Sequence, residues 1–345
     1  MKQSLKPILI GLALFACYLQ PLFSQDLHFT NNQIIPTFIN AAQTGAYAGN
    51  YRAGLIYRDQ WRSGVSDPYQ QAAVFVDSPF MFGLNKQQWI GGGITMFYDR
   101  GGAPTQTWSG LYPSLSYHIS FDKKYRNVFT IGAQYGMASR KYSDKNWTSE
   151  DEELGLVVSS PDRGRIQDLN ANYGDLNISL LFKSKIDKFS RFEIGGSVQH
   201  LLKPKLKFSA GSSGESAGQS FVARRINIHS AYRRAVSPQM VWEPAIYASI
   251  ATGSQNIQIQ LRNEYLLKKG GDISIISGLG FRFGDALQLL LGAHYKDYLF
   301  MFSYDQSAGA FGNDLAASAF EFGVMKHFVV NKKPKVKPII YCPRL

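Results

Sequence analysis

The stretch Gln255-Asn256-Ile257-Gln258-Ile259-Gln260-Leu261-Arg262 alternates between apolar and polar side chains. Successive side chains of a β-strand point to opposite faces, so this segment would carry isoleucine and leucine on one face and glutamine and arginine on the other. The same period of two recurs before residue 184, around residues 195 and 228, and near residue 290. The chain is therefore predicted to consist of amphipathic strands.

Alternating segments of about ten residues, bounded by turn residues, recur along the chain after residue 50. We expect about fourteen strands, an even number, as is usual for bacterial barrels made of one chain. The expected strands are 51–59, 69–77, 89–98, 107–120, 127–140, 174–184, 190–202, 222–235, 240–251, 255–267, 272–283, 286–297, 298–306 and 318–330.

A β-sandwich would also alternate, but three further features favour a membrane barrel. Strands of about ten residues or more can cross a bilayer when tilted, and aromatic residues recur near the strand ends, as in interfacial girdles. Loop length alternates as well. If the first strand runs outward, the long segments 141–173, 203–221 and 307–317 fall outside, and short turns near 121–126, 185–189, 236–239 and 268–271 fall in the periplasm. We therefore predict an all-β fold, a transmembrane antiparallel β-barrel with long external loops.

The composition agrees with this fold class. Aromatic residues make up 14% of the chain and charged residues only 18%, below the roughly 25% of soluble domains. A mean hydropathy of −0.18 is too polar for a helical membrane protein. The formal net charge of +12 could suggest nucleic acid as a partner, but export from the cytoplasm argues against it.

The first 25 residues are predicted to be a cleaved signal peptide. Lys2 and Lys6 precede the short apolar stretch 8–16, and small Ser24 marks a cleavage point. The alternatives are an uncleaved anchor and a lipoprotein box at 14–17. After cleavage Cys342 is the remaining cysteine, so no internal disulfide is expected. The predicted division is 1–25 signal peptide, 26–50 N-terminal segment leading into the barrel, 51–330 barrel and 331–345 basic periplasmic tail.

No catalytic residue, cofactor or metal site is predicted, so the chain is not expected to be an enzyme. The six histidines are scattered without metal-ligand spacing, and neither a nucleophile elbow nor a phosphate-binding glycine loop is found. Catalysis at the barrel rim would have His200 and His229 as its nearest candidates. The run 150–153 is acidic but lacks the alternating spacing of a calcium loop.

Basic residues gather on the predicted periplasmic side. A run of charge is ordinarily a solvated edge, and the alternative is a positive ring that docks a periplasmic partner. The ring would comprise Lys123, Lys124, Lys185, Lys188, Lys268 and Lys269, joined by Lys332, Lys333, Lys335 and Lys337 of the tail.

Several short motifs resemble those of the PorP/SprF family of type IX secretion system outer-membrane proteins of Bacteroidota. The resemblance is carried by Asp26-Leu27-His28-Phe29-Thr30-Asn31-Asn32-Gln33, the stretch Pro36-Thr37-Phe38-Ile39-Asn40-Ala41-Ala42-Gln43-Thr44-Gly45, Tyr57-Arg58-Asp59-Gln60-Trp61, Tyr304-Asp305, Ala319-Phe320-Glu321 and the ending Cys342-Pro343-Arg344-Leu345. Leu27 stands where the family usually has proline, and Asn40-Ala41-Ala42 replaces the usual Asn-Pro-Ala.

The resemblance implies an outer-membrane component that assists export or surface attachment of particular proteins, such as gliding adhesins. Its expected partners are outer-membrane lipids, periplasmic and outer-membrane components of the secretion system, and the exported surface protein. The candidate partner-binding residues are Tyr57, Arg58, Gln60, Trp61, Lys332, Lys333, Lys335, Lys337, Cys342, Pro343 and Arg344. The alternatives are a transporter or pore for small or hydrophobic solutes, with a lumen often occupied by N-terminal residues, and a structural or adhesive barrel.

Overall fold

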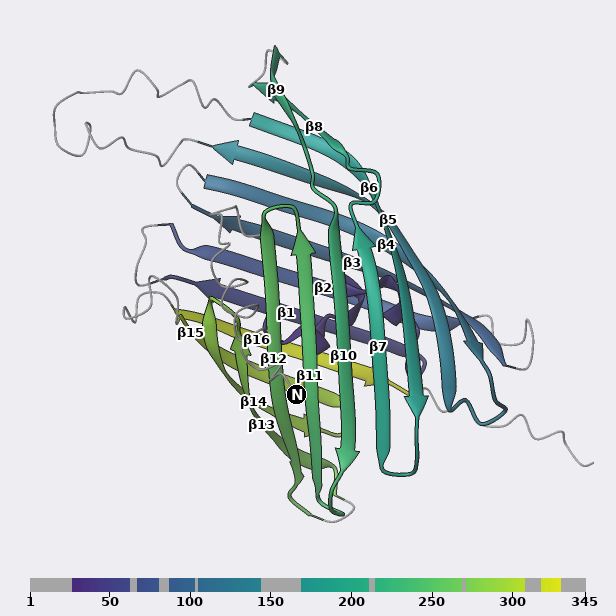
Figure 1. Cartoon of the computed structure of the whole chain (residues 1–345). Helices are drawn as coiled ribbons and strands as arrows, with labels where there is room; N and C mark the ends of the chain where they lie inside the picture. The colour runs from purple at the N-terminus through teal and green to yellow at the C-terminus, as the bar shows by residue number, and fades with distance from the viewer. Residues whose placement is uncertain are drawn as a thin grey trace, which may run out of the picture.

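A computed structural model describes residues 27–62, 67–80, 87–102, 105–143, 169–210, 215–268, 271–307 and 318–329. Fourteen of its strands close into one antiparallel barrel (Figure 1). Neighbours in sequence pair with each other around most of the wall, and the first strand, β1, pairs with the last, β16, to close it. The predicted fold class is confirmed.

The barrel strands are β1 (Tyr51–Gln60), β2 (Tyr69–Phe80), β3 (Gln88–Gly101), β4 (Thr105–Ser120), β5 (Asn127–Ser143), β6 (Leu169–Lys185), β7 (Ser190–Gln199), β10 (Arg225–Ala235), β11 (Met240–Ala251), β12 (Ser254–Leu266), β13 (Ile273–Arg282), β14 (Ala286–Tyr295), β15 (Tyr298–Ser307) and β16 (Ser318–Phe328). Each predicted strand has its counterpart here, and the largest difference in a boundary is at β6, which begins at 169 instead of 174.

The segment 203–221 was expected to be a loop, and that expectation is wrong. It contains a hairpin of β8 (Lys205–Ala210) and β9 (Glu215–Phe221), which pairs with the first residues of β6. The hairpin lies outside the closed order of the barrel strands and stands at the end of the barrel where β5 finishes and β6 begins (Figure 1). We name this the long-loop end, and the opposite end the short-turn end.

The wall presents its apolar face outward and its polar face inward. On β12, Ile259 and Leu261 are 45% and 50% exposed, whereas Gln258 and Gln260 are 2% and 4% exposed. This arrangement suits a barrel whose outside meets lipid and whose inside holds polar groups. In the part of the chain that the structure describes, no helix is long and apolar enough to cross a membrane.

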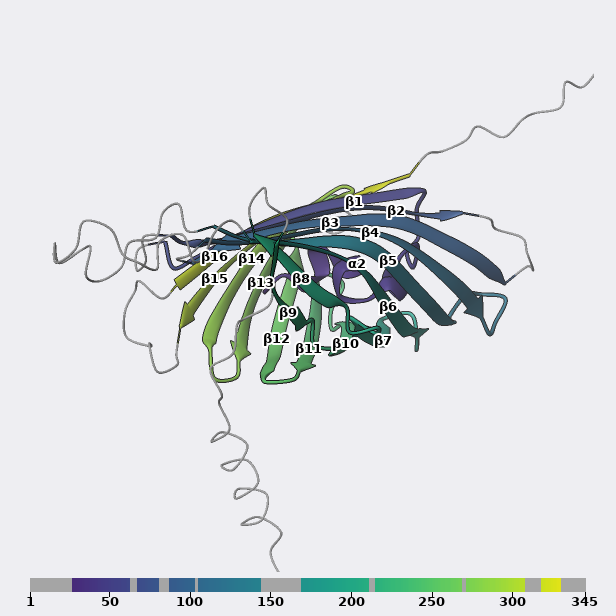
Figure 2. The ribbon, with the colours of Figure 1, turned by 90° about the horizontal axis from the view of Figure 1, so that it is seen from above.

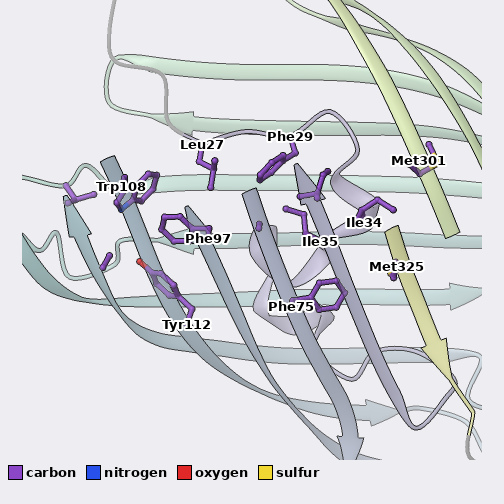
Figure 3. Close-up of a cluster of buried hydrophobic side chains, with 14 of the residues drawn as sticks. Leu27, Phe29, Ile34, Ile35, Phe75, Phe97, Trp108, Tyr112, Met301 and Met325 are labelled. Atoms are coloured by element: carbon purple, nitrogen blue, oxygen red, sulfur yellow. The ribbon is translucent and has the colours of Figure 1, made fainter. Parts of the chain in front are cut away.

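Residues 27–50, which we name the N-terminal plug, lie inside the barrel. They form three short helical turns, η1 (Asn32–Ile34), α2 (Pro36–Ile39) and η2 (Ala41–Gln43), and Figure 2, seen from above, shows α2 enclosed between β1–β5 and β10–β12. The apolar side chains of the plug join a buried cluster with residues of the wall. Figure 3 shows members of this cluster, among them Phe29, Ile34, Ile35, Phe75, Phe97 and Met301.

Candidate functional site

The start of the plug is bound by carboxylates from the last two strands. The backbone amide of Thr30 donates to Glu321 Oε1 at 2.6 Å, and the Thr30 hydroxyl donates to Asp305 Oδ2 at 2.6 Å. The amide of Asn31 donates to Glu321 Oε2 at 2.9 Å. One glutamate on β16 therefore accepts hydrogen bonds from two successive backbone amides of the plug.

Two arginines neutralise these carboxylates. Arg58 Nη1 lies 2.8 Å from Asp305 Oδ2 and 2.7 Å from Glu321 Oε1, and Arg282 Nη2 lies 3.0 Å from Asp305 Oδ2. All four side chains are at most 3% exposed. Buried charges are costly unless they are paired and hydrogen-bonded, as these are. We name Thr30, Arg58, Arg282, Asp305 and Glu321 the Thr30 network.

The middle of the plug is bound by β3, β5 and β6. The hydroxyls of Thr37 and Thr95 are 2.8 Å apart, and Gln134 Nε2 donates to the carbonyl of Thr37 at 2.9 Å. Asn40 Nδ2 donates to the carbonyl of Leu180 at 3.0 Å, and its Oδ1 accepts from the amide of Ala42, which caps η2. These contacts fix α2 and η2 to the wall.

The end of the plug turns sharply where it meets the wall. Gly45 has a positive φ of 67°, and its amide donates to Asp77 Oδ2 at 2.8 Å. Arg52 forms an ion pair with the same carboxylate, also at 2.8 Å. A Cβ on Gly91 would lie 2.3 Å from the carbonyl oxygen of Thr44, so close packing explains the glycine run at 91–93.

The structure divides the predicted partner-binding residues between two places. Arg58 and Gln60 point into the lumen, where Gln60 Oε1 accepts from Arg58. Tyr57 is 40% exposed on the outer face, and Trp61, after the end of β1, packs edge-on against Tyr69. Their contact with a partner stays a prediction. The predicted tail residues Lys332, Lys333, Lys335, Lys337, Cys342, Pro343 and Arg344 lie outside the described residues.

The structure brings together residues from several of the motifs that carry the family resemblance, although not all of them were predicted to be site residues. Asp305 and Glu321 stand in the quoted motifs, and they meet Arg58 and Thr30 of two other motifs. Arg282 belongs to no motif and was missed. The sequence feature that could have identified Arg282 is its charge on the inward face of a predicted strand.

The histidines proposed for rim catalysis have structural partners. His200 Nδ1 lies 2.7 Å from Asp175 Oδ2, and His229 Nε2 lies 3.0 Å from Asn40 Nδ2 of the plug. Within the described residues, neither is hydrogen-bonded to a serine, and no group of three His, Cys, Asp or Glu side chains could hold a metal ion. The two histidines therefore act here as contacts of the wall and the plug.

A space with a volume of about 90 Å³ lies beside the plug, between it and residues of β7, β10, β11 and β12. We name it the lateral crevice. Its lining includes Asn32, Pro36 and Ile39 of the plug and Ala231, Ala245, Gln258 and Arg262 of the wall.

Lysines surround the short-turn end. Lys123, Lys124, Lys185, Lys188 and Lys268 are all exposed in or beside the turns that follow β4, β6 and β12. They form an exposed basic rim on the side predicted to face the periplasm.

Comparisons with known proteins give a family and a fold. The family model described as type IX secretion system membrane protein PorP/SprF matches residues 22–324. No curated protein sequence matches the chain.

Two solved structures show the similarity of fold. The chain is similar to the Ralstonia pickettii toluene transporter TbuX, with a TM-score of 0.51 and 9% identity over 84% of this chain and 92% of that one. It is also similar to the P. putida toluene transporter TodX, with a TM-score of 0.50 and 10% identity over 88% of this chain and 95% of that one. At such low identity the similarity concerns the barrel fold alone.

Proposed function

The chain belongs to the type IX secretion system membrane protein PorP/SprF family, and from this premise we propose that it is a non-enzymatic docking platform in the outer membrane of Bacteroidota. It would assist export or surface attachment of specific proteins, such as gliding adhesins, after its own export by a signal peptide. The observation that supports a platform is the filled lumen, because the plug occupies the space through which a polypeptide would otherwise pass.

Displacing the plug would break contacts along its whole length. The Thr30 network binds its first residues, wall side chains such as Thr95 and Gln134 bind its middle, and Asp77 binds its end. A polypeptide passing through the lumen would have to replace all of these. We therefore assign the binding of partners to the two ends of the barrel.

At the long-loop end, Tyr57 and Trp61 lie near the exit of β1, and the β8–β9 hairpin extends from the wall. We assign the exported protein or its surface partner to this end. At the short-turn end, the basic rim and the tail 331–345 would dock a periplasmic component of the secretion system that carries acidic residues. The outward apolar face would meet the lipids.

The first experiment asks whether the plug must move. Thr37 and Thr95 have hydroxyls 2.8 Å apart on the plug and the wall, so Thr37→Cys with Thr95→Cys, in a Cys342→Ser background, can join the two by a disulfide. The oxidising compartment outside the inner membrane permits the bond. Thr37→Cys alone, in the same background, is the matched control.

The readout is the profile of surface proteins in a deletion strain that carries each variant. We expect deletion to remove one or a few surface proteins, and both the locked variant and its control to restore them. If the locked variant fails and chemical reduction restores secretion, the lumen is a conduit and the platform is refuted. If deletion leaves the surface profile unchanged, the role in secretion itself is refuted.

A second candidate function is the transport of small or hydrophobic solutes. The lateral crevice favours it, because it leaves space beside the plug. On this alternative, deletion would leave the surface proteins unchanged and lower uptake of a solute, and the locked variant would remain impaired in uptake.

A further inference from the structure

The lateral crevice lies between points at which the plug is bound to the wall. Thr37, Asn40 and Thr44 bind side chains or carbonyls of β3, β4 and β6. On the other side, Ser197 and Gln260 donate to the carbonyls of Ile39 and Thr30, and Asn40 and Gln43 reach His229 and Glu193. Between these contacts, two directly paired residues, Ala231 and Ala245, carry single methyl groups and leave space.

The crevice is closed toward the long-loop end. Gln258, Arg282 and Gln288 are each 2% exposed there, and Arg282 and Gln288 both donate to the Thr30 hydroxyl. Toward the short-turn end the lumen is wetter, since the side chains of Glu193 and Arg233 are 29% and 39% exposed. A ligand would therefore enter from the periplasmic side.

The chemistry of the lining selects the ligand. Arg262 is 7% exposed, and its Nη1 and Nη2 donate to Gln260 and Glu243. Its Nε is buried without a hydrogen-bond partner, as is Nδ2 of Asn32 across the crevice. A guanidinium can only donate, so the missing partner must be an acceptor such as an oxygen. Buried polar groups of this kind are ordinarily satisfied, and each one calls for an explanation.

The rest of the lining is largely apolar, and the volume of the crevice limits the size of its ligand. Pro36, Ile39, Ala231 and Ala245 supply apolar contacts. A cavity of about 150 Å³ accepts benzene, so the 90 Å³ of the crevice suit a solute of roughly four non-hydrogen atoms. The neighbouring ion pairs, Arg262 with Glu243 and Lys183 with Glu193, balance one another. An oxygen acceptor is therefore needed more than a net charge.

We propose that the lateral crevice is a periplasm-facing binding site for small acyl solutes, carboxamides or carboxylates, whose oxygen meets Arg262 and Asn32 and whose short apolar end meets Ile39 and the two alanines. This inference does not depend on the role in secretion. The size of the crevice limits the affinity, so binding is in the millimolar range.

The test uses the purified full chain in detergent micelles and saturation-transfer NMR with three probes: acetamide, acetate and ethylammonium. We expect saturable binding of acetamide and acetate and none of ethylammonium, which offers no acceptor. Comparing acetamide with acetate separates a carbonyl ligand from an anion. Arg262→Met should weaken binding of both at least tenfold.

Ala245→Phe should abolish binding by filling the crevice. Its matched control is Ala248→Phe on the same strand, whose residue pairs with the outward-facing positions Ile228 and Ile257. Heat-modifiable migration on gels verifies that each variant is folded. Absence of binding by every probe would mean that water alone fills the crevice, and equal binding of ethylammonium or undiminished binding in Ala245→Phe would also overturn the proposal.

Discussion

Arg58→Met should release the start of the plug without unfolding the barrel. Within the described residues Arg58 is the one basic side chain that forms an ion pair with Glu321, while Asp305 keeps Arg282 as a second partner. Methionine preserves most of the length of the side chain but removes the charge. Glu321 is 1% exposed and would be left buried without its counter-ion.

The size of the effect follows from this burial. Removing one partner of a buried ion pair costs about 3–5 kcal/mol. We expect the lower value, about 3 kcal/mol, because Glu321 keeps the backbone donors of Thr30 and Asn31. A difference of that size raises the population of the opened plug by roughly two orders of magnitude. The backbone ladder of the wall is untouched.

Hydrogen exchange at the amides of Thr30 and Asn31 measures this opening directly, since both donate to Glu321. In Arg58→Met we expect these amides to exchange about 100-fold faster, with the ladder amides of β1 unchanged. Arg62→Met is the control, because Arg62 also pairs with a carboxylate but its side chain is 62% exposed. Surface pairs contribute about 0–1 kcal/mol. An acceleration below tenfold in Arg58→Met, or an equal one in Arg62→Met, would refute the reasoning.

Three further predictions concern the plug and a turn at the short-turn end. Gly132→Ala should expel the plug and raise conductance in planar bilayers, because its Cβ would lie 2.3 Å from a backbone nitrogen of the plug. The control is Gly174→Ala, whose Cβ would meet only the end of a tyrosine side chain and should leave conductance unchanged. Equal conductance in the two variants would contradict the prediction. Asn40→Ala removes the cap of η2 and a contact to the wall. A loss of about 1 kcal/mol of stability in η2 should raise hydrogen exchange at its amides about fivefold. Unchanged hydrogen exchange would show that the cap contributes nothing. The amide of Phe189 donates to Asp187 and holds the pKa of that carboxyl below its usual value. The stabilisation of the turn is therefore present above about pH 3.9 and is lost as pH falls through the lowered pKa. An NMR titration of Asp187 with its midpoint at the ordinary value would refute this prediction.

The strands could be predicted from the sequence because the membrane imposes a simple rule on them. A residue such as Ile259 must face lipid and its neighbour Gln260 must not, so the period of two persists along each strand. The β8–β9 hairpin was missed although Lys205, Leu206, Lys207 and Phe208 alternate. Its alternation lasts only a few residues, and its position between longer strands favoured a loop.

The plug could not be predicted in the same way. Its helical turns are three or four residues long, too short for a helical period to develop. Its partners lie far away in sequence: Thr30 binds residues 305 and 321. An inward-facing charge such as Glu321 shows that the lumen is polar, but it does not show which segment the charge binds. The motifs of the resemblance did point to these residues, without a reason for their proximity.

The seam between β1 and β16 has a consequence for the order of events during assembly. Arg58 and Glu321 are direct partners across this seam, and both bind the plug, which precedes β1 in the chain. The start of the plug, Thr30 and Asn31, therefore has no carboxylate to bind until the last two strands arrive, whereas its end can already reach Asp77 on β2. Closing the wall and seating the start of the plug become one event in time, and a chain truncated before β15 would lack both.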